Sequence, residues 1–249
     1  MARRLFPGIA LGAMALGVSA FLVILPTVSS ACQPTSTSTS VSAAEVADAI
    51  APGTDVLIVG DSYTSGRGST SGVHGWAQDI AADRDWNAKI DGYPGTGYVD
   101  TGRTGSSHYT FGPRIERHAA FDPQLVIVQG SQNDWLVDSE KLQATVERTL
   151  RTAEQTWPDA VVVAVGPSAP QPWASSTVGV AASVSAGAAA AGVPYIDALG
   201  GQWFTSMNSP GYAASDGAHL NDAGYQYLAD RIEESLDALA TPADGEQCA

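Results

Sequence analysis

Cysteine and lysine are scarce in this 249-residue sequence, and their scarcity excludes several kinds of chemistry. The two cysteines, Cys32 and Cys248, do not have the spacing of a zinc site, and no His-Glu-any-any-His stretch occurs. We therefore expect neither a metal nor another cofactor. Because Lys89 and Lys141 are the only lysines, a mechanism built on a lysine amine is also disfavoured.

Positive charge is low throughout. The chain has 12 lysines and arginines against 26 aspartates and glutamates, a formal net charge of −14. Proteins that bind nucleic acid neutralise phosphates with basic side chains, so this balance excludes nucleic acid as a partner. The hydrophobic share of 44% is ordinary for a globular domain with a sizeable core.

The N-terminal residues differ in kind from the rest. Arg3 and Arg4 precede an apolar run over Leu5–Leu25, and small residues at Ser29 and Ala31 follow it. This pattern predicts a signal peptide over residues 1–31, and hence a secreted or cell-surface protein. A retained membrane anchor is the alternative, because the apolar run is almost long enough to span a bilayer. Cleavage would leave 10 basic and 26 acidic residues, a net charge of −16.

Cys32 directly follows the predicted cleavage point. The Ser/Thr-rich stretch behind it predicts a linker over residues 32–50, with one domain over residues 51–249. A lipid on Cys32 would tether the domain to a membrane through that linker. A disulfide between Cys32 and Cys248 is equally compatible with an exported protein. Both alternatives stay open.

The domain alternates short apolar runs with helical patterns. Runs without clean polar alternation, each ending in a turn, are typical of parallel strands covered on both faces. Together the two patterns predict an α/β fold, a three-layer α/β/α sandwich around a central parallel sheet. The predicted strands are Val56–Val59, Ala88–Asp91, Leu125–Gln129, Val161–Val165 and Tyr195–Ala198; the predicted helices lie around Trp76–Arg84, Leu142–Leu150, Val178–Ala191 and Tyr225–Ile232.

Two motifs suggest nucleophilic catalysis. Ser62 lies in the turn Gly60–Gly66, directly after the first predicted strand, where a hydroxyl can face a substrate. A serine hydroxyl needs a neighbouring base, and His219 near the C-terminus is a candidate. Asp216, three residues earlier, could hold the second ring nitrogen of that histidine. A capping loop with an incidental histidine is the plain alternative.

Two further turns offer hydrogen-bond donors. In Gly130–Asp134 the amide of Asn133 could donate to a developing oxyanion, although Asn and Asp are also ordinary turn residues. In Gly92–Gly97 the backbone amides could offer another donor. The active groups of an open parallel sheet gather at the carboxyl ends of its strands, and all four motifs fall there.

Taken in order, these motifs make the chain resemble an SGNH hydrolase of the GDSL esterase group, over roughly Asp55 to the end. The resemblance implies a flavodoxin-like fold and ester hydrolysis through an acyl-enzyme. It implies Ser62 as nucleophile, His219 as base and Asp216 as its orienting partner, with oxyanion donors from Ser62, Gly95 and Asn133. The third block departs from the family's Gly-any-Asn-Asp: either Ser131 replaces the Gly, or one residue is inserted after Gly130. In the second block Gly97 competes with Gly95 as the donor.

The sequence favours a short-chain ester of a small molecule or polysaccharide as substrate, because no long apolar lid is evident. Transfer of the acyl group to a sugar or alcohol is an alternative, as is a non-catalytic carbohydrate- or flavin-binding module at Thr64–Ser69. The connection Tyr98–Pro123 is predicted to be a long functional loop. Tyr98, Tyr109 and Phe111 are candidates to line the cleft. Trp135, Trp173 and Trp203 could stack on a sugar there, with burial in the core as an equal alternative for each. Residues expected to be ordinary are Asp61, which braces its loop, and His74, His108 and His118, which lack acidic partners nearby in sequence.

Overall fold

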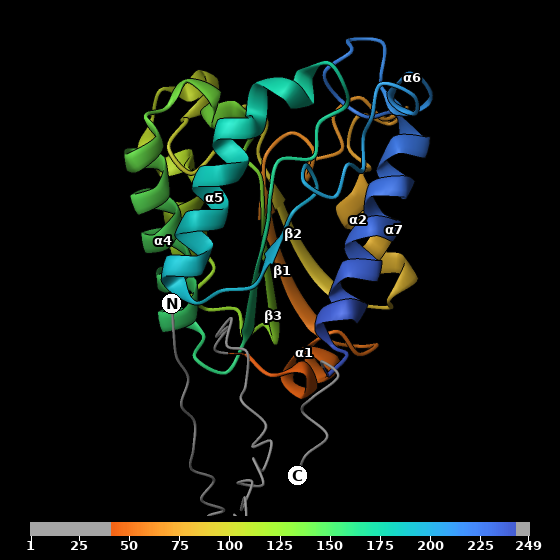
Figure 1. The fold of residues 1–249 in the computed structure, drawn as a ribbon. Helices are drawn as coiled ribbons and strands as arrows, with labels where there is room; N and C mark the ends of the chain where they lie inside the picture. Colours follow the sequence, from red (N-terminus) through yellow and green to blue (C-terminus); the bar gives the residue numbers. More distant parts are fainter. Residues whose placement is uncertain (1–40, 243–249) are drawn as a thin grey trace, which may run out of the picture. The chain divides into compact units, whose positions relative to one another are not determined.

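The computed structural model describes residues 41–242 (Figure 1). The predicted signal peptide, Cys32 and Cys248 lie outside the described residues. The alternatives of a lipid tether and a disulfide therefore remain predictions from the sequence.

A five-stranded parallel sheet forms the centre of the domain, with strand order β2-β1-β3-β4-β5. This confirms the predicted α/β class. The register brings the carboxyl ends of three strands level, since Gly60 at the end of β1 lies opposite Gly92 of β2 and Gln129 of β3. Three of the four motifs therefore start from neighbouring points of one sheet edge. The strands are β1 Asp55–Gly60, β2 Asn87–Gly92, β3 Leu125–Gln129, β4 Val161–Val165 and β5 Tyr195–Ile196.

Helices cover both faces of the sheet (Figure 1). Along β1, Val56 and Ile58 belong to one hydrophobic cluster while Leu57 and Val59 belong to the other, so successive side chains point to opposite faces. The three-layer sandwich is thus confirmed. On the first face lie α1 Ala43–Ala49, α2 Trp76–Asp83 and α7 Asp222–Leu239; on the second lie α3 Phe111–Arg117, α4 Ser139–Thr156 and α5 Val178–Ala191.

Helix α1 corrects the predicted linker over residues 32–50. Ser42 and Glu45 form a reciprocal capping box at its start. Val46 and Ala49 are buried in the core, and the Trp86 Nε1–H donates to the carbonyl oxygen of Ile50 (3.2 Å). The packed domain therefore includes residues that the composition assigned to a linker, because a seven-residue helix is too short to show a period beside a Ser/Thr run.

The sequence predicted a long loop from Tyr98 to Pro123, and the structure shows that this prediction was wrong. It holds the short helices η1 Gly102–Thr104 and η2 Ser107–Tyr109, followed by α3. Tyr98 and Phe111 are buried against each other, with ring centroids 4.8 Å apart, so they fill the core rather than line a cleft. Burial of these two rings stabilises an ordered structure in this segment, although the residues around them are mostly polar.

The remaining aromatic residues are divided between core and surface. Trp203 is buried, whereas the rings of Trp135 and Trp173 meet edge to face, with their centroids 5.6 Å apart. Tyr109 is half-buried against Tyr93 (4.7 Å). Within the described residues, Trp173–Ala191 is long and apolar enough to cross a membrane, but it is half buried in the domain, as a core helix is. The short helices η3 Gln132–Leu136, η4 Trp173–Thr177 and α6 Ser209–Tyr212 complete the described elements.

Candidate active site

Ser62 lies in a tight turn at the end of β1 and is 5% exposed. Asp61 Oδ1 accepts the N–H of Tyr63 (2.9 Å), and the Thr64 hydroxyl donates to Gln129 Oε1 at the end of β3 (2.9 Å). A Cβ on Gly60 would overlap the Thr64 hydroxyl, so this position requires glycine. The turn is therefore fixed from both sides before a substrate arrives.

His219 is the hydrogen-bond partner of Ser62. Its Nε2 lies 3.0 Å from Ser62 Oγ, although the two residues are 157 positions apart. Its Nδ1 lies 2.7 Å from Asp216 Oδ2. The structure thus brings together the serine, histidine and aspartate that the sequence singled out.

Asp216 holds the imidazole in one orientation and one tautomer. Burial alone would raise the pKa of Asp216, but the N–H of His219, its imidazole and the N–H of Ala218 outweigh burial and lower the pKa to about 2. An ionised carboxylate only accepts hydrogen bonds, so Nδ1 of His219 carries the proton. Its Nε2 then has a free lone pair to accept the Ser62 hydroxyl proton.

Tyr63 packs against the His219 ring and holds the turn that carries it. Its ring lies 5.5 Å from the His219 ring, and its hydroxyl donates to the carbonyl oxygen of Ala218. Gly68 allows a second close approach, because a Cβ there would come within 2.7 Å of His219 Cβ. Neither residue could be identified from the sequence, since nothing local marks a tyrosine or glycine as a neighbour of a residue more than 150 positions away.

Two main-chain amides of the motif turns, those of Ser62 and Gly95, have no acceptor among the described residues. Across residues 41–242, the N–H groups of Ser62 and Gly95 donate to no protein atom, whereas the N–H of Gly97 donates to the carbonyl oxygen of Asp100 (2.9 Å). Gly95 therefore fits the role of a free donor better than Gly97. Gly95 also has a φ of +81°, a conformation that glycine adopts without strain.

Asn133 lies in η3 and contacts a chain neighbour of each of these two residues. Its Nδ2 donates to the carbonyl oxygen of Thr96 (2.8 Å) and makes a long contact with Asp61 Oδ2 (3.5 Å). The amide thus reaches the segment that carries Gly95 and the segment that carries Ser62. The Ser131 hydroxyl accepts the Asn133 N–H (3.2 Å), so the residue that departs from the family pattern begins the helical turn.

Asp134 organises the same region and was not identified from the sequence. Its carboxylate accepts the N–H groups of Tyr98 (2.9 Å), Val99 (3.2 Å) and Asp100 (2.7 Å). Burial raises the pKa of Asp134, and these three amides oppose the rise. The carboxylate fixes the stretch directly after Gly97 against the helical turn that holds Asn133.

Two of the histidines expected to lack acidic partners have them. His74 Nε2 lies 2.6 Å from Asp79, and His118 Nε2 lies 3.0 Å from Asp91 Oδ2. The second pair could not be anticipated, because the two residues come from α3's C-cap and from β2. Within the part of the chain that the structure describes, no group of three or more His, Cys, Asp or Glu side chains could hold a metal ion.

The geometry suits attack by a serine hydroxyl on a carbonyl carbon. A hydroxyl, an imidazole and an ionised carboxylate form one hydrogen-bonded series. Among residues 41–242 the N–H groups of Ser62 and Gly95 have no protein acceptor, and the Asn133 amide contacts Asp61 and Thr96, the chain neighbours of these two residues. Groups of these kinds can remove the hydroxyl proton and stabilise the negative charge that develops on the carbonyl oxygen.

Known proteins share this sequence pattern and fold. A model of the GDSL-like lipase/acylhydrolase family matches residues 58–227. The GDSL lipase Rv0518 of Mycobacterium tuberculosis is 31% identical over 190 residues, which cover 71% of this chain and 79% of that protein.

Solved structures at lower identity share the fold. A family two carbohydrate esterase from Clostridium thermocellum, in complex with cellohexaose, matches with a TM-score of 0.60 and 15% identity, over 76% of this chain and 65% of that chain. The inhibitor-bound aryl esterase of M. smegmatis matches with a TM-score of 0.55 and 19% identity, over 75% of this chain and 99% of that chain. With its family model, its relative and its fold in agreement, this chain belongs to the GDSL-like lipase/acylhydrolase family and is an ester-hydrolysing enzyme.

Proposed function

We propose that this chain is an exported serine esterase that hydrolyses short-chain carboxylic esters through an acyl-enzyme on Ser62. The observation that carries the proposal is the 3.0 Å contact between Ser62 Oγ and His219 Nε2, with Asp216 on the other ring nitrogen at 2.7 Å. This is the arrangement in which a neutral imidazole can act as a general base.

In the proposed mechanism, Ser62 Oγ attacks the ester carbonyl carbon while its proton passes to His219 Nε2. The C–O bond to the alcohol then breaks, and His219 returns the proton to the departing oxygen. A water molecule then attacks the acyl carbon while its proton passes to the same nitrogen. The bond between the acyl carbon and Ser62 Oγ breaks, His219 returns the proton to Oγ, and the acid is released with the enzyme restored. Asp216 stabilises the imidazolium in both halves of the cycle.

The negative charge on the carbonyl oxygen is assigned to three donors: the N–H groups of Ser62 and Gly95 and the amide of Asn133. The two main-chain groups have no competing acceptor within residues 41–242. The Asn133 amide keeps its 2.8 Å bond to Thr96, and its contact with Asp61 is 3.5 Å long and weak enough to be exchanged for the substrate.

Relatives support a small acyl group. Proteins of this fold include one named a carbohydrate acetylesterase family member, from Sinorhizobium meliloti, and an acetyl xylan esterase from the rumen bacterium Butyrivibrio proteoclasticus. We assign acetyl or similarly short esters of a small molecule or polysaccharide to this chain on that basis. A flavin-phosphate role for Thr64–Ser69 is disfavoured, because the hydroxyls of Thr64, Ser65 and Ser69 already donate to protein acceptors.

The proposal is tested by hydrolysis of p-nitrophenyl esters from acetate to palmitate. We expect activity that falls with chain length and disappears in Ser62→Ala, while Ser71→Ala, an exposed serine in the same loop, keeps wild-type rates. Wild-type turnover in Ser62→Ala would contradict the assignment of the nucleophile. If product forms only when a sugar or alcohol acceptor is added, the enzyme transfers the acyl group instead of hydrolysing it.

Loss of the side-chain oxyanion donor is tested separately. Asn133→Ala is expected to lower kcat about 100- to 1000-fold, because the donor acts on charge that exists only near the transition state. Activity near that of the wild type would remove Asn133 from the proposed donors.

A further inference from the structure

Arg114 is a buried cation close to the proposed site. It lies on α3, within the stretch predicted to be a loop, and its side chain is 0% exposed. Burial lowers the pKa of Arg114, but hydrogen bonds and the charge of Asp91 oppose this. A guanidinium without water must find all its acceptors within the protein, so its contacts identify what it holds together.

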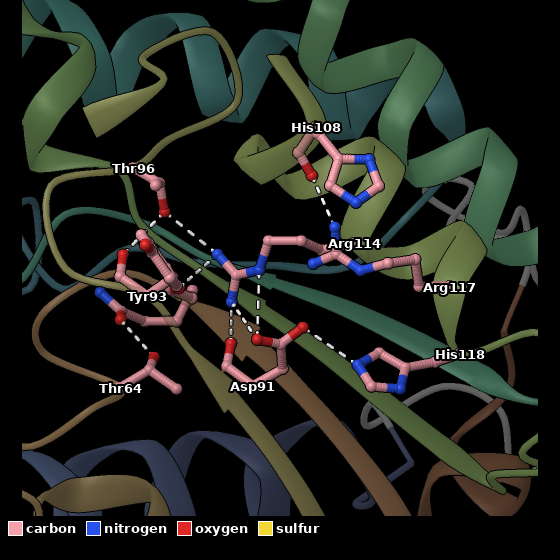
Figure 2. Close-up of polar contacts among 10 residues, drawn as sticks. Thr64, Asp91, Tyr93, Thr96, His108, Arg114, Arg117 and His118 are labelled. Atoms are coloured by element: carbon pink, nitrogen blue, oxygen red, sulfur yellow. Dashed lines mark hydrogen bonds and ion pairs between the residues drawn. The ribbon is translucent and has the colours of Figure 1, made fainter. Parts of the chain in front are cut away.

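The fork of Arg114 uses all five of its N–H donors (Figure 2). Nη1 donates to the carbonyl oxygen of Gly60 (3.0 Å) and to the Thr96 hydroxyl (3.0 Å). Nε and Nη2 donate to Asp91 Oδ1 (3.2 and 2.9 Å), and Nη2 also donates to the Asp91 main-chain oxygen. The other carboxylate oxygen of Asp91 contacts His118 (3.0 Å), which completes the set.

Two of these acceptors, Gly60 and Thr96, lie within two residues of the proposed main-chain oxyanion donors. Gly60 is the last residue of β1, two positions before Ser62. Thr96 follows Gly95, its hydroxyl donates to the carbonyl oxygen of Tyr93 (2.7 Å), and its own carbonyl oxygen accepts the Asn133 amide. One guanidinium nitrogen therefore spans the segments that carry the two free amides, and through Thr96 it reaches the third donor.

We propose that Arg114 is a positioning residue for the oxyanion donors, acting through Gly60 and Thr96; this inference rests on the proposed function. Stabilisation of a developing charge depends on donors held within about 0.5 Å of their productive positions. A planar guanidinium fixes the separation of two acceptors, one at the end of β1 and one in the turn after β2, which a flexible ammonium does not. Asp91 holds the guanidinium in its plane from the opposite edge.

The test compares kcat per active site in Thr96→Val, Thr96→Ser and Arg114→Lys. Sites are counted by titration with a fluorophosphonate, so misfolded protein does not contribute. Thr96→Val removes the hydroxyl that Arg114 holds, and we expect kcat to fall about 10- to 100-fold with KM changed by less than about threefold. Thr96→Ser keeps the hydroxyl, and its kcat is expected to stay near that of the wild type. Arg114→Lys, where it folds, is expected to behave like Thr96→Val.

The matched control is Arg117→Lys, on the same helix, where the exposed side chain donates only to the carbonyl oxygen of His108 (2.7 Å). It is expected to keep wild-type kcat. A purely structural role for the Arg114 contacts would lower thermal stability and the titratable fraction but leave kcat per site unchanged in Thr96→Val, and that result would overturn the inference. Turnover that persists in Ser62→Ala would instead overturn the proposed function itself.

Discussion

At the scale of single residues, Asp216 and His219 show how three positions of sequence define a base and its orientation. Asp216 Oδ1 accepts the N–H groups of Ala218 (3.0 Å) and His219 (2.9 Å), which leaves Oδ2 directed at the ring. The same carboxylate therefore folds the turn and selects the tautomer. Asp61, the residue before Ser62, differs from Asp216 in exposure: Asp61 is completely buried, whereas the side chain of Asp216 is 45% exposed.

Asp216→Asn tests the tautomer argument. The Asn amide would present a donor to Nδ1 and favour the proton on Nε2, which removes the base from Ser62. We expect kcat/KM for p-nitrophenyl acetate to fall about 100- to 10,000-fold. Asp222→Asn is the matched control. Asp222 begins α7, and its carboxylate accepts hydrogen bonds from Thr70 and not from a histidine. A loss in Asp216→Asn no larger than in this control would contradict the role of Asp216.

Asp61 is expected to make stability depend on pH. Burial raises the pKa of Asp61 to about 7, against about 3.9 in an unfolded chain. The folded protein therefore binds this proton more tightly, so the free energy of unfolding that Asp61 contributes is greatest below pH 4 and declines as pH rises through 7. Asn does not titrate, yet its side-chain oxygen can still accept the Tyr63 N–H.

The measurement is urea unfolding of wild type and Asp61→Asn at pH 4.5 and pH 7.5. We expect the wild type to lose more stability than the variant over this interval, by on the order of 2 kcal/mol. Equal pH dependence in both proteins would show that Asp61 is ionised at little cost.

At the scale of helices and strands, α4 and α5 approach each other closely. α5 is rich in alanine, and a Cβ on Gly187 would lie 2.6 Å from Val146 Cβ and 2.8 Å from the Gln143 carbonyl oxygen. The small residues of α5 therefore allow the two helices to approach. Gly179, in the first turn of the same helix, has nothing within 4 Å of that position.

Gly187→Ala and Gly179→Ala form a matched pair. Alanine favours a helix over glycine by about 1 kcal/mol at both positions. At Gly187 the added methyl must displace α4, so we expect a net loss of about 1–3 kcal/mol, a fall in Tm of roughly 2–4 °C for each kcal/mol. Gly179→Ala is expected to keep or raise the Tm. Thermal unfolding followed by circular dichroism measures both, and an unchanged Tm in Gly187→Ala would contradict the close approach.

Elements with a strong period or apolar run were predicted from the sequence nearly to the residue, and short ones were not. Leu125–Gln129, Val161–Val165 and Val178–Ala191 have the predicted bounds, whereas the last strand is only Tyr195–Ile196. Helices α1 and α3 were missed. Each has seven residues, too few for periodicity, and each owes its order to packing against residues distant in sequence.

At the scale of the whole molecule, the net charge depends on whether the predicted signal peptide is removed. The basic residues of the first 31 positions are Arg3 and Arg4, and no acidic residue lies there. Removal of this segment makes the protein more acidic, and a strongly negative net charge favours solubility over association with anionic surfaces. Residues 1–31 lie outside the described structure, so processing is argued from sequence alone.

The intact mass of the protein recovered from its native host tests export. We expect a chain that begins at Cys32. An added lipid mass would identify a membrane tether, and a loss of two hydrogens relative to the reduced chain would identify the Cys32–Cys248 disulfide. A mass that still includes residues 1–31 would contradict removal of the signal peptide.

The sequence by itself determined the α/β class and the order of the motifs along the chain, and it predicted Ser62, Asp216, His219 and Asn133 as candidate site residues. These follow from local patterns: apolar runs, turn residues, and a three-residue spacing that places a carboxylate beside an imidazole. Tertiary structure alone decided that the N–H of Gly95 is free while that of Gly97 is bonded. It also decided that Arg114 joins two strand ends, because contacts between distant segments depend on register and packing, which no local pattern encodes.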